Sequence, residues 1–350
     1  MKRAIVIVGG VLGVVMLLLG GGFFWASRVA AAKRAAHYET HRVEFPIPFP
    51  LASDEVAALR VERAAAAKPP TVAGAAPEVA AAPPPDPLAG VDLKAAANER
   101  AVVRGKHLIE SRYACTACHG ADLGGGTMVD APPIGSIFGV NITSGKGGVV
   151  AGYRASDWDR IVRHGVKTDG LPAMMPSEDF FQMSDHELSD IVAYITSVPP
   201  VDREMARPRL GPVGTVLVAL GKLPLSAENK ADHQASHAAE PPPTAVSLEF
   251  GQHLVSICMG CHSQTLAGGP IPGGDPSWPH AANLTQHPQG LAGWTYDDFV
   301  RALREGKRKD GTALRKPMSD MTKYGANCTE TELKAMWAYV QSVPPRPTPK

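Results

Sequence analysis

The sequence has little of what builds a disulfide-stabilised or a nucleic-acid-binding protein. Its five cysteines in 350 residues are too few and too clustered for a disulfide framework. A formal net charge of +1 excludes a strong field that would attract nucleic acid. Aromatic residues are scarce, whereas proline and glycine number 32 and 35. This composition favours modest domains joined by long connections, and the length is enough for two or three of them.

One long hydrophobic run stands out, close to the first residue. Lys2 and Arg3 precede apolar residues from Ala4 to Ala26. At about 1.5 Å per helical residue, such a run crosses a hydrocarbon core of roughly 30 Å. The apolar region of a cleaved secretory signal is usually shorter. We therefore predict a retained membrane anchor over residues 1–33, and cleavage near residues 29–33 is the alternative.

A biased segment follows the predicted anchor. Residues 62–90 are nearly all alanine, proline, valine and glycine, and they show neither helical nor strand periodicity. Proline-rich segments favour the extended polyproline II conformation, at about 3.1 Å per residue. We therefore predict that residues 34–96 form a stalk that carries the rest of the chain away from the membrane. An ordered extension packed on the protein is the alternative.

The remainder of the chain repeats itself. "GKHLIESRYACTACHG" at 105–120 resembles "GQHLVSICMGCHS" at 251–263, and "AYITSVPP" at 193–200 resembles "AYVQSVPP" at 338–345. A domain repeated once explains both matches. We assign the first copy to residues 97–202, an inter-domain segment to 203–246 and the second copy to 247–346.

Each copy predicts three helices and otherwise loop, so the predicted fold class is all-α. The first pair covers about 97–116 and 247–259, and the second covers 155–164 and 295–305. The third pair begins at Ser184 and Thr329, each followed three residues later by glutamate in capping-box spacing. Three helices of this length bury little apolar surface, so another group must fill the middle of each domain.

The motif that opens each copy suggests what this group is. Cys115, Cys118 and His119 form the first C-x-x-C-H motif, and Cys258, Cys261 and His262 form the second. This motif is typical of covalent c-type haem attachment, in which both thiols form thioethers and the histidine binds the iron. A redox cysteine pair does not need the histidine, and zinc would need four ligands per site. We therefore predict two haem c groups.

The second axial ligand of each iron is predicted to be methionine, because His/Met ligation is the arrangement of cytochromes c. The candidates are Met174, Met175 and Met183 in the first copy, and Met318 and Met321 in the second. Met175 follows His119 by 56 positions, and Met318 follows His262 by the same number. The repeat therefore favours Met175 and Met318, with Met321 as the main rival. Met183 is predicted to pack in the core.

The other histidines are assigned structural roles. His107 and His253 recur before the haem cysteines, and we predict that they pack against helices and do not bind iron. His37 and His41 stand four apart but lack further ligands nearby in the sequence, so no metal site is predicted there. His164 is interpreted as structural.

Three further features fall outside the motifs. Asn141 and Asn283 occupy matching places in the two copies and are candidates for hydrogen bonds to haem propionates. The apolar stretch in "GPVGTVLVALGKLPL" at 211–225 is too short to span a membrane. We expect it to pack against the first domain or to lie at a partner interface.

The chain resembles the membrane-anchored multi-haem c-type cytochromes of bacteria, including the cytochrome subunits of periplasmic dehydrogenases. The matching stretches between residues 97 and 346 include "CTACHG", "MPSEDFFQMSDHEL", "AYITSVPPVDRE" and "LKAMWAYVQSVPP". The resemblance implies two tandem class I cytochrome c domains with loop-rich haem pockets and His119/Met175 and His262/Met318 as axial pairs. Two departures are the alanine- and proline-rich segment and Ser319, which stands where a proline usually follows the ligand.

These features predict an electron carrier rather than an enzyme. Haem is attached in this way outside the cytoplasm, so residues 27–350 are expected in the periplasm and the anchor in the inner (cytoplasmic) membrane. Six-coordinate haems transfer electrons without binding substrate. The expected donor is a dehydrogenase, the acceptor is a terminal oxidase or another cytochrome, and no nucleic acid is involved. The alternative is a di-haem oxidoreductase enzyme of the peroxidase or thiosulfate dehydrogenase type.

Overall fold

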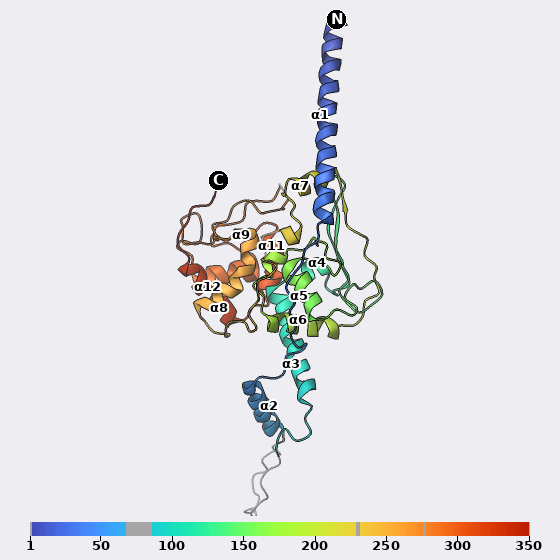
Figure 1. Cartoon of the computed structure of the whole chain (residues 1–350). Coiled ribbons are helices and arrows are strands. Elements are labelled where there is room, and N and C mark those ends of the chain that lie inside the picture. The colour runs from blue at the N-terminus through green and yellow to red at the C-terminus, as the bar shows by residue number, and fades with distance from the viewer. Residues whose placement is uncertain (1, 68–85, 229–231, 276, 350) are drawn as a thin grey trace, which may run out of the picture.

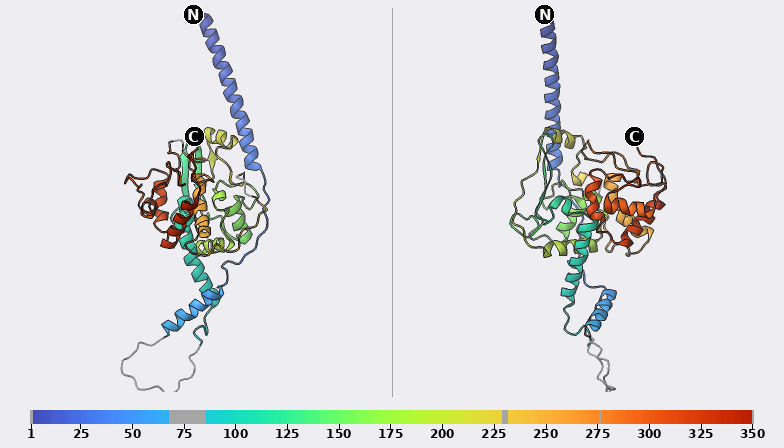
Figure 2. Two further views of the ribbon diagram at one scale, coloured as in Figure 1. Left: turned by 90° about the vertical axis from the view of Figure 1, so that its left-hand side faces the viewer. Right: turned by 180° about the vertical axis from the view of Figure 1, so that it is seen from behind.

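The computed structural model describes residues 2–67, 86–228, 232–275 and 277–349. Helix α1 (Lys2–Ala35) projects from one side of a globular body that holds both repeats (Figure 1). Helix α2 (Ser53–Ala66) lies on the opposite side, next to the beginning of α3 (Figures 1 and 2). The long axis of the molecule therefore runs from α1 through the body to α2.

The first repeat is built around two helices that cross closely. Helix α3 (Leu93–His107) packs on α6 (Asp185–Ser197), with Gly105 at the contact. A Cβ atom at Gly105 would lie 1.9 Å from the carbonyl oxygen of Asp190, so only glycine fits there. The remaining helices of this repeat are the π-helical turn η1 (Leu108–Arg112), α4 (Thr116–His119), α5 (Ala155–His164) and the short 3-10 helix η2 (Ser177–Asp179).

The second repeat has the same arrangement. Helix α8 (Leu248–Val255) packs on α12 (Glu330–Ser342), and Gly251 meets the carbonyl of Ala335 as Gly105 meets that of Asp190. Its other helices are η4 (Ser256–Cys258), α9 (Met259–His262), α10 (Tyr296–Glu305) and α11 (Met318–Gly325).

The predicted starts of the third helix in each repeat are confirmed. The Ser184 side chain accepts a hydrogen bond from the backbone N–H of Glu187, and the Glu187 carboxylate accepts one from the N–H of Ser184. Thr329 and Glu332 make the same two bonds at the start of α12. These reciprocal bonds satisfy backbone donors that a helix leaves open at its first turn.

The fold is mostly helical, but the all-α prediction misses a small sheet. Strands β1 (Gly126–Ala131), β2 (Gly135–Gly139) and β3 (Arg209–Leu210) form an antiparallel sheet in that order. β1 and β2 lie in regions predicted as glycine-rich loop, because short strands of this composition show no clear periodicity. β3 comes from the inter-domain segment, so its pairing with β2 could not be found from local sequence.

The prediction of a stalk over residues 34–96 is wrong for much of its length. Phe45 is buried in the core of the first repeat. Tyr38 donates its N–H to the Gly170 carbonyl at 3.0 Å, and Ser189 Oγ donates to the Pro46 carbonyl at 2.8 Å. The first repeat therefore follows α1 directly, because aromatic and apolar side chains of this segment pack in its core. Residues 68–85 of the predicted stalk lie outside the described residues.

The last turns of α1 pack on a helix of the inter-domain segment. Ala30, Val218 and Leu225 form a small buried cluster where α1 meets α7 (Pro212–Ala219). The 3-10 helix η3 (Ser226–Glu228) follows. This confirms that the apolar stretch at 211–225 packs against the first domain, where Val213 donates its N–H to the Pro133 carbonyl, and it packs against α1 as well.

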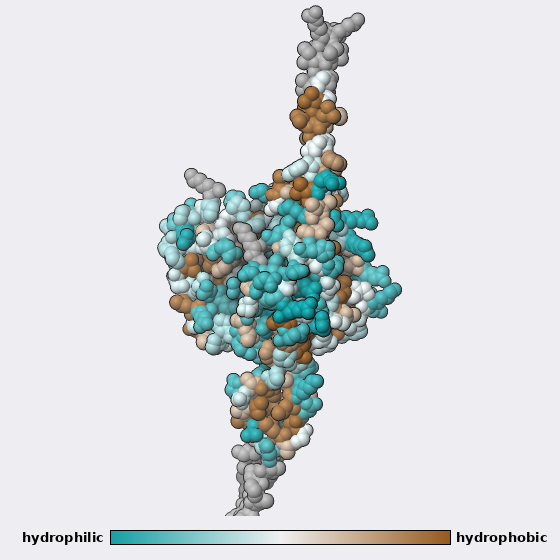
Figure 3. Space-filling view, in the orientation of Figure 1, coloured by the Kyte–Doolittle hydropathy of each residue, from teal (hydrophilic) through white to brown (hydrophobic). Residues whose placement is uncertain are grey.

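The exposed part of α1 is strongly apolar. Figure 3 shows hydrophobic side chains of α1 standing clear of the globular body. Large apolar residues from Leu12 to Trp25 are exposed there. Within the described residues, Leu12–Ala35 is the one helical stretch long and apolar enough to cross a membrane. These properties are compatible with the predicted anchor.

The two repeats are joined by a reciprocal pair of ion pairs. His107 on α3 contacts Glu332 of the second repeat, with 2.9 Å between Nε2 and Oε1. His253 on α8 contacts Glu187 of the first repeat, with 3.0 Å between the corresponding atoms. Both histidines thus contact carboxylates across the boundary between the repeats, a polar role in place of the helix packing predicted for them.

Candidate haem sites

The first C-x-x-C-H motif opens onto a large apolar cavity. The cavity has a volume of about 1230 Å³ and is lined by Cys115, Cys118, His119 and Met175. Further apolar side chains complete the lining, among them Tyr113, Trp158, Phe180, Ile191 and Ile195. Pockets for small molecules usually measure about 300–1,000 Å³, so this one has room for a large, flat and apolar group. It is the missing interior that the short helices of this repeat require.

The four motif cysteines are available for covalent attachment. All are free thiols. Burial raises the pKa of Cys115 and of Cys258 to about 12, and it also raises the pKa values of Cys118 and Cys261. Net addition of each S–H bond across a haem vinyl group would form a thioether and release no group.

The motif histidines are held in the orientation that a metal ligand needs. The Nδ1–H of His119 donates to the Val140 carbonyl at 2.8 Å, and that of His262 donates to the Ala282 carbonyl at 2.7 Å. Burial lowers the pKa of both side chains, which keeps them neutral. Each Nε2 therefore carries a free lone pair, as an iron ligand requires.

Met175 is placed at the wall of the first cavity. It lines the cavity and packs against the core of the first repeat. Met174 also reaches the cavity, but it packs against the cluster of Val218 and Leu225 beneath α1. The Met175 N–H donates to Ser226 Oγ at 2.7 Å, which ties the loop to η3. Met183 is buried in the core as predicted, with 2 % of its surface exposed, and it also lines the cavity.

The methionine loop of the second repeat begins like the first and then departs from it. Gly165 and Gly306 both end their helices in the left-handed conformation, and a single β-bridge follows each, Val166–Pro172 and Lys307–Ala313. Met318 then opens α11, where the first repeat has only η2. Met318 is half-buried, whereas Met321 has 37 % of its surface exposed. The greater burial favours Met318 over its rival.

The two motif regions lie close together across the domain boundary. Gly260, between the second pair of cysteines, lies against the Asp179 carboxylate at the end of η2. Thr116 in the first motif and Tyr324 on α11 are hydrogen bonded through their hydroxyls at 2.9 Å. Burial and then the charge of Glu178 raise the pKa of Asp179 to about 7. The methionine loop of one repeat thus touches the cysteine motif of the other.

The two asparagines have structural partners in place of the predicted propionates. The Asn141 amide donates to the Val201 carbonyl at 2.7 Å, and its oxygen accepts from Thr143. Asn283 makes the same contacts with the Arg346 carbonyl and Thr285. Each asparagine therefore fastens a glycine-rich loop to the segment that follows the last helix of its repeat.

Comparison with protein families agrees with this geometry. Residues 100–195 match the family "Cytochrome C oxidase, cbb3-type, subunit III", and residues 248–344 match the family "Cytochrome c". Each match covers one repeat and includes its C-x-x-C-H motif. The chain is a di-haem cytochrome c. The cytochrome carries two covalently bound haem c groups, one in each domain.

Curated relatives of the cytochrome are subunits of bacterial dehydrogenases. It is 28% identical to the fructose dehydrogenase cytochrome subunit of Gluconobacter japonicus, over 71% of this chain and 54% of the relative. It is 30% identical to the alcohol dehydrogenase (quinone) cytochrome c subunit of Gluconacetobacter polyoxogenes, over 66% and 53%. For the gluconate 2-dehydrogenase cytochrome c subunit of Pantoea cypripedii the values are 28%, 71% and 60%. The chain thus spans about half the length of the first two relatives.

Proposed function

We propose that this cytochrome is the electron-transfer subunit of a membrane-bound dehydrogenase. In this proposal Cys115, Cys118, Cys258 and Cys261 form the thioethers, and the axial pairs are His119/Met175 and His262/Met318. The observation that carries the proposal is the pair of hydrogen bonds from His119 Nδ1 to the Val140 carbonyl and from His262 Nδ1 to the Ala282 carbonyl. These bonds leave each Nε2 with a free lone pair.

The chain's own residues position the groups and exclude water. Bound haem supplies a one-electron redox couple. The backbone carbonyls of Val140 and Ala282 orient the two imidazoles, and the apolar wall of the first cavity keeps solvent away. Met175 and Met318 would complete the ligand sets of the two irons, which would leave no position for a substrate. Asp179 follows Met175 by four residues and contacts Gly260, so the methionine loop of the first domain lies against the second cysteine motif.

The proposed location is the inner membrane, with both haem domains in the periplasm. The apolar surface of α1 supports an anchor. Phe24 and Trp25 are exposed in the C-terminal half of α1, and aromatic residues are common at a membrane interface. Because α1 leads directly into the first domain, that domain is expected to lie close to the membrane surface.

The proposed donor is a dehydrogenase subunit, since the relatives are cytochrome subunits of fructose, alcohol and gluconate dehydrogenases. The proposed acceptor is a terminal oxidase or another cytochrome. Co-purification from membranes would identify both.

Two measurements test the proposal. Mass spectrometry of the mature chain should show two covalent haem additions, and haem that is lost on acid extraction would contradict thioether attachment. The visible spectrum of the reduced protein should not respond to carbon monoxide, because both axial positions are filled. A carbon monoxide complex at either haem would favour the di-haem enzyme instead.

A further inference from the structure

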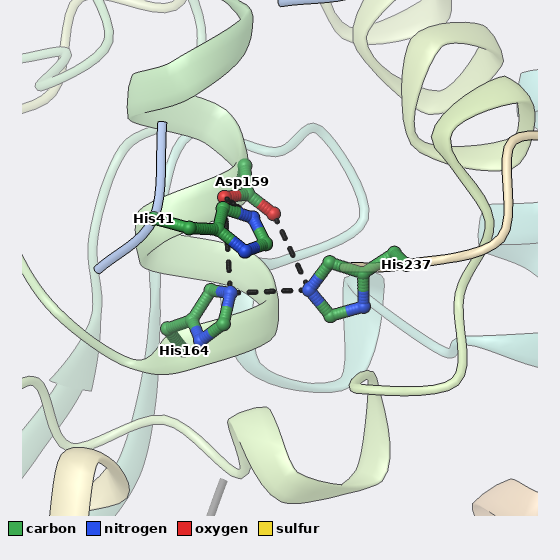
Figure 4. Close-up of side chains that lie close together, drawn as sticks. All are labelled: His41, Asp159, His164 and His237. Atoms are coloured by element: carbon green, nitrogen blue, oxygen red, sulfur yellow. Dashed lines mark hydrogen bonds and ion pairs between the residues drawn. The ribbon is translucent and has the colours of Figure 1, made fainter. Parts of the chain in front are cut away.

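Four side chains converge in the first domain, away from the cysteine motif. They are His41, Asp159, His164 and His237, and their ligand atoms all lie within 4.8 Å of one another (Figure 4). His41 comes from the segment after α1, Asp159 and His164 lie on α5, and His237 comes from the inter-domain segment. The side chains of Asp159 and His164 are fully buried, that of His237 is 3% exposed and that of His41 is 15% exposed.

The distances between these atoms fit one tetrahedral metal ion. His164 Nε2 lies 3.1 Å from His237 Nε2, and His41 Nε2 lies 3.2 Å from Asp159 Oδ2. Asp159 Oδ2 lies 3.8 Å from His164 Nε2, and the other carboxylate oxygen, Oδ1, lies 3.6 Å from His237 Nε2. A zinc ion with bonds of about 2.0–2.1 Å holds its tetrahedral ligand atoms about 3.3–3.4 Å apart. The four groups therefore need only small movements to bind one ion.

The surrounding hydrogen bonds turn two lone pairs toward each other. His237 Nδ1 faces the Phe181 carbonyl at 3.0 Å, so this nitrogen carries the proton. His233 donates from Nε2 to the Ala227 carbonyl, which leaves its Nδ1 to accept from His164 Nδ1 at 3.3 Å. The Nε2 atoms of His164 and His237 are then both unprotonated. Two lone pairs 3.1 Å apart repel each other unless a cation lies beside them.

The other two ligand atoms also lack a donor or acceptor of their own. Within the described part of the chain, His41 Nε2 and Asp159 Oδ2 are buried and make no hydrogen bond, and they face each other at 3.2 Å. The second carboxylate oxygen of Asp159 is bound by Arg163, whose charge is shared with Asp185. One oxygen of Asp159 therefore remains for an ion.

We propose that His41, Asp159, His164 and His237 bind a single zinc ion. Three imidazole nitrogens and one carboxylate oxygen are ligands that zinc accepts, and four protein ligands leave no open position, as in structural sites. The hydrogen bonds of His164 to His233 and of His237 to Phe181 then act as the outer shell that orients the ligands. The ion fastens the segment after α1 and the inter-domain segment to α5.

Metal analysis of the full-length, haem-loaded protein tests this proposal. The protein is treated with a chelator, equilibrated with zinc sulfate at micromolar concentration and freed of unbound metal before zinc and iron are counted. We expect one zinc for two haem irons. His164→Asn and His237→Asn should lose this zinc, whereas His280→Asn, an exposed histidine of the second domain, should retain it. His233→Ala should weaken zinc binding by about 10- to 100-fold.

A second readout is a comparison of the wild-type protein with and without zinc, which does not depend on the folding of a variant. Arg42 is exposed next to His41, so zinc should slow tryptic cleavage after Arg42 in the wild-type protein. In His41→Gln the rate should be the same with zinc and with chelator. Absence of zinc from the equilibrated wild-type protein, which would leave only a shared proton in the cluster, would overturn the proposal. Unchanged zinc in both ligand variants, or cleavage indifferent to zinc in the wild type, would do the same.

Discussion

At each C-x-x-C-H motif the histidine is held by one backbone carbonyl, and in the first domain the sheet supplies it. Val140 directly follows β2, and the preceding Gly139 lies against the Cys118 carbonyl, where an added Cβ would approach to 1.9 Å. The small sheet therefore contacts the motif and positions the Val140 carbonyl that accepts the hydrogen bond from His119. In the proposed ligation, the sheet would thereby position an iron ligand.

The methionine ligands can be tested one domain at a time. Met175→His should lower the potential of one haem on the order of 0.1 V, within the roughly 0.8 V that axial ligands span, because nitrogen stabilises ferric iron more than a thioether does. Met318→His should do the same to the other haem. Potentiometric titration followed by visible absorption measures both potentials.

Met321→Leu is the matched control for the second domain. Because Met321 is the more exposed of the two candidates, its replacement should leave both potentials unchanged. If Met321→Leu alters the second haem and Met318→Leu does not, the ligand assignment in that domain is wrong.

At the level of elements, each domain depends on one close helix crossing. Gly105→Ala should force α3 away from α6, since the new Cβ would collide with a backbone carbonyl that cannot rotate aside. We expect a loss of about 1–3 kcal/mol or more in the free energy of unfolding. Val103→Ala, on the exposed face of the same helix, should stay within about 0.5 kcal/mol. Guanidinium denaturation of the two variants compares them directly.

The contact between α6 and the second domain predicts a dependence of stability on acid. Burial by itself would raise the pKa of Glu187, but the charge of Arg112 and the hydrogen bond of His253 outweigh it and lower this pKa to about 2. Since the ordinary value is 4.5, the carboxylate stabilises the fold above pH 4.5, and this contribution is lost as the pH falls towards 2. Its full size is about 3 kcal/mol.

In wild type the free energy of unfolding should fall between about pH 5 and pH 3, and in Glu187→Gln this fall should be smaller. Denaturant titrations at several pH values in this range measure both. Glu249→Gln, an exposed residue at the start of α8, should keep the wild-type slope. Identical slopes for wild type and Glu187→Gln would show that this ion pair does not control acid stability.

Local patterns predicted most of the helices, and non-local contacts explain the misses. The capping boxes at Ser184 and Thr329 and the helices at 155–164 and 295–305 follow from a few neighbouring residues each. The cysteine motifs likewise carry their chemistry in five positions. Strand β3 and the packing of Phe45 depend on partners far along the chain, so no local periodicity predicts them.

The four-residue cluster in the first domain was missed for the same reason. His41 has no further ligands near it in the sequence, and His164 has no partner motif of its own. Their common neighbour His237 lies in the inter-domain segment. A signal was present in the composition of that segment, where two histidines stand within "HQASH" at 233–237. Only the fold shows that they face the same side of α5.

For the whole molecule, the docked segment after α1 separates two kinds of truncation. A variant that lacks residues 1–24 and carries a cleavable export signal should be soluble, retain both haems and unfold like the wild type. Removing residues 1–50 should lower the melting temperature, because Phe45 leaves the core and His41 leaves Asp159. Thermal unfolding of both variants measures the difference. Equal melting temperatures would show that residues 25–50 contribute nothing to the first domain.

The histidine–glutamate contacts between the repeats follow a rule normally met between separate chains. His107 and His253 are equivalent positions, as are Glu187 and Glu332, and each histidine contacts the glutamate of the other repeat. Such exchange, in which i meets j and j meets i, is the mark of an isologous two-fold interface. A chain holding one repeat alone would present the same complementary pair to another copy of itself. Dividing this protein at the inter-domain segment would therefore expose surfaces suited to self-association.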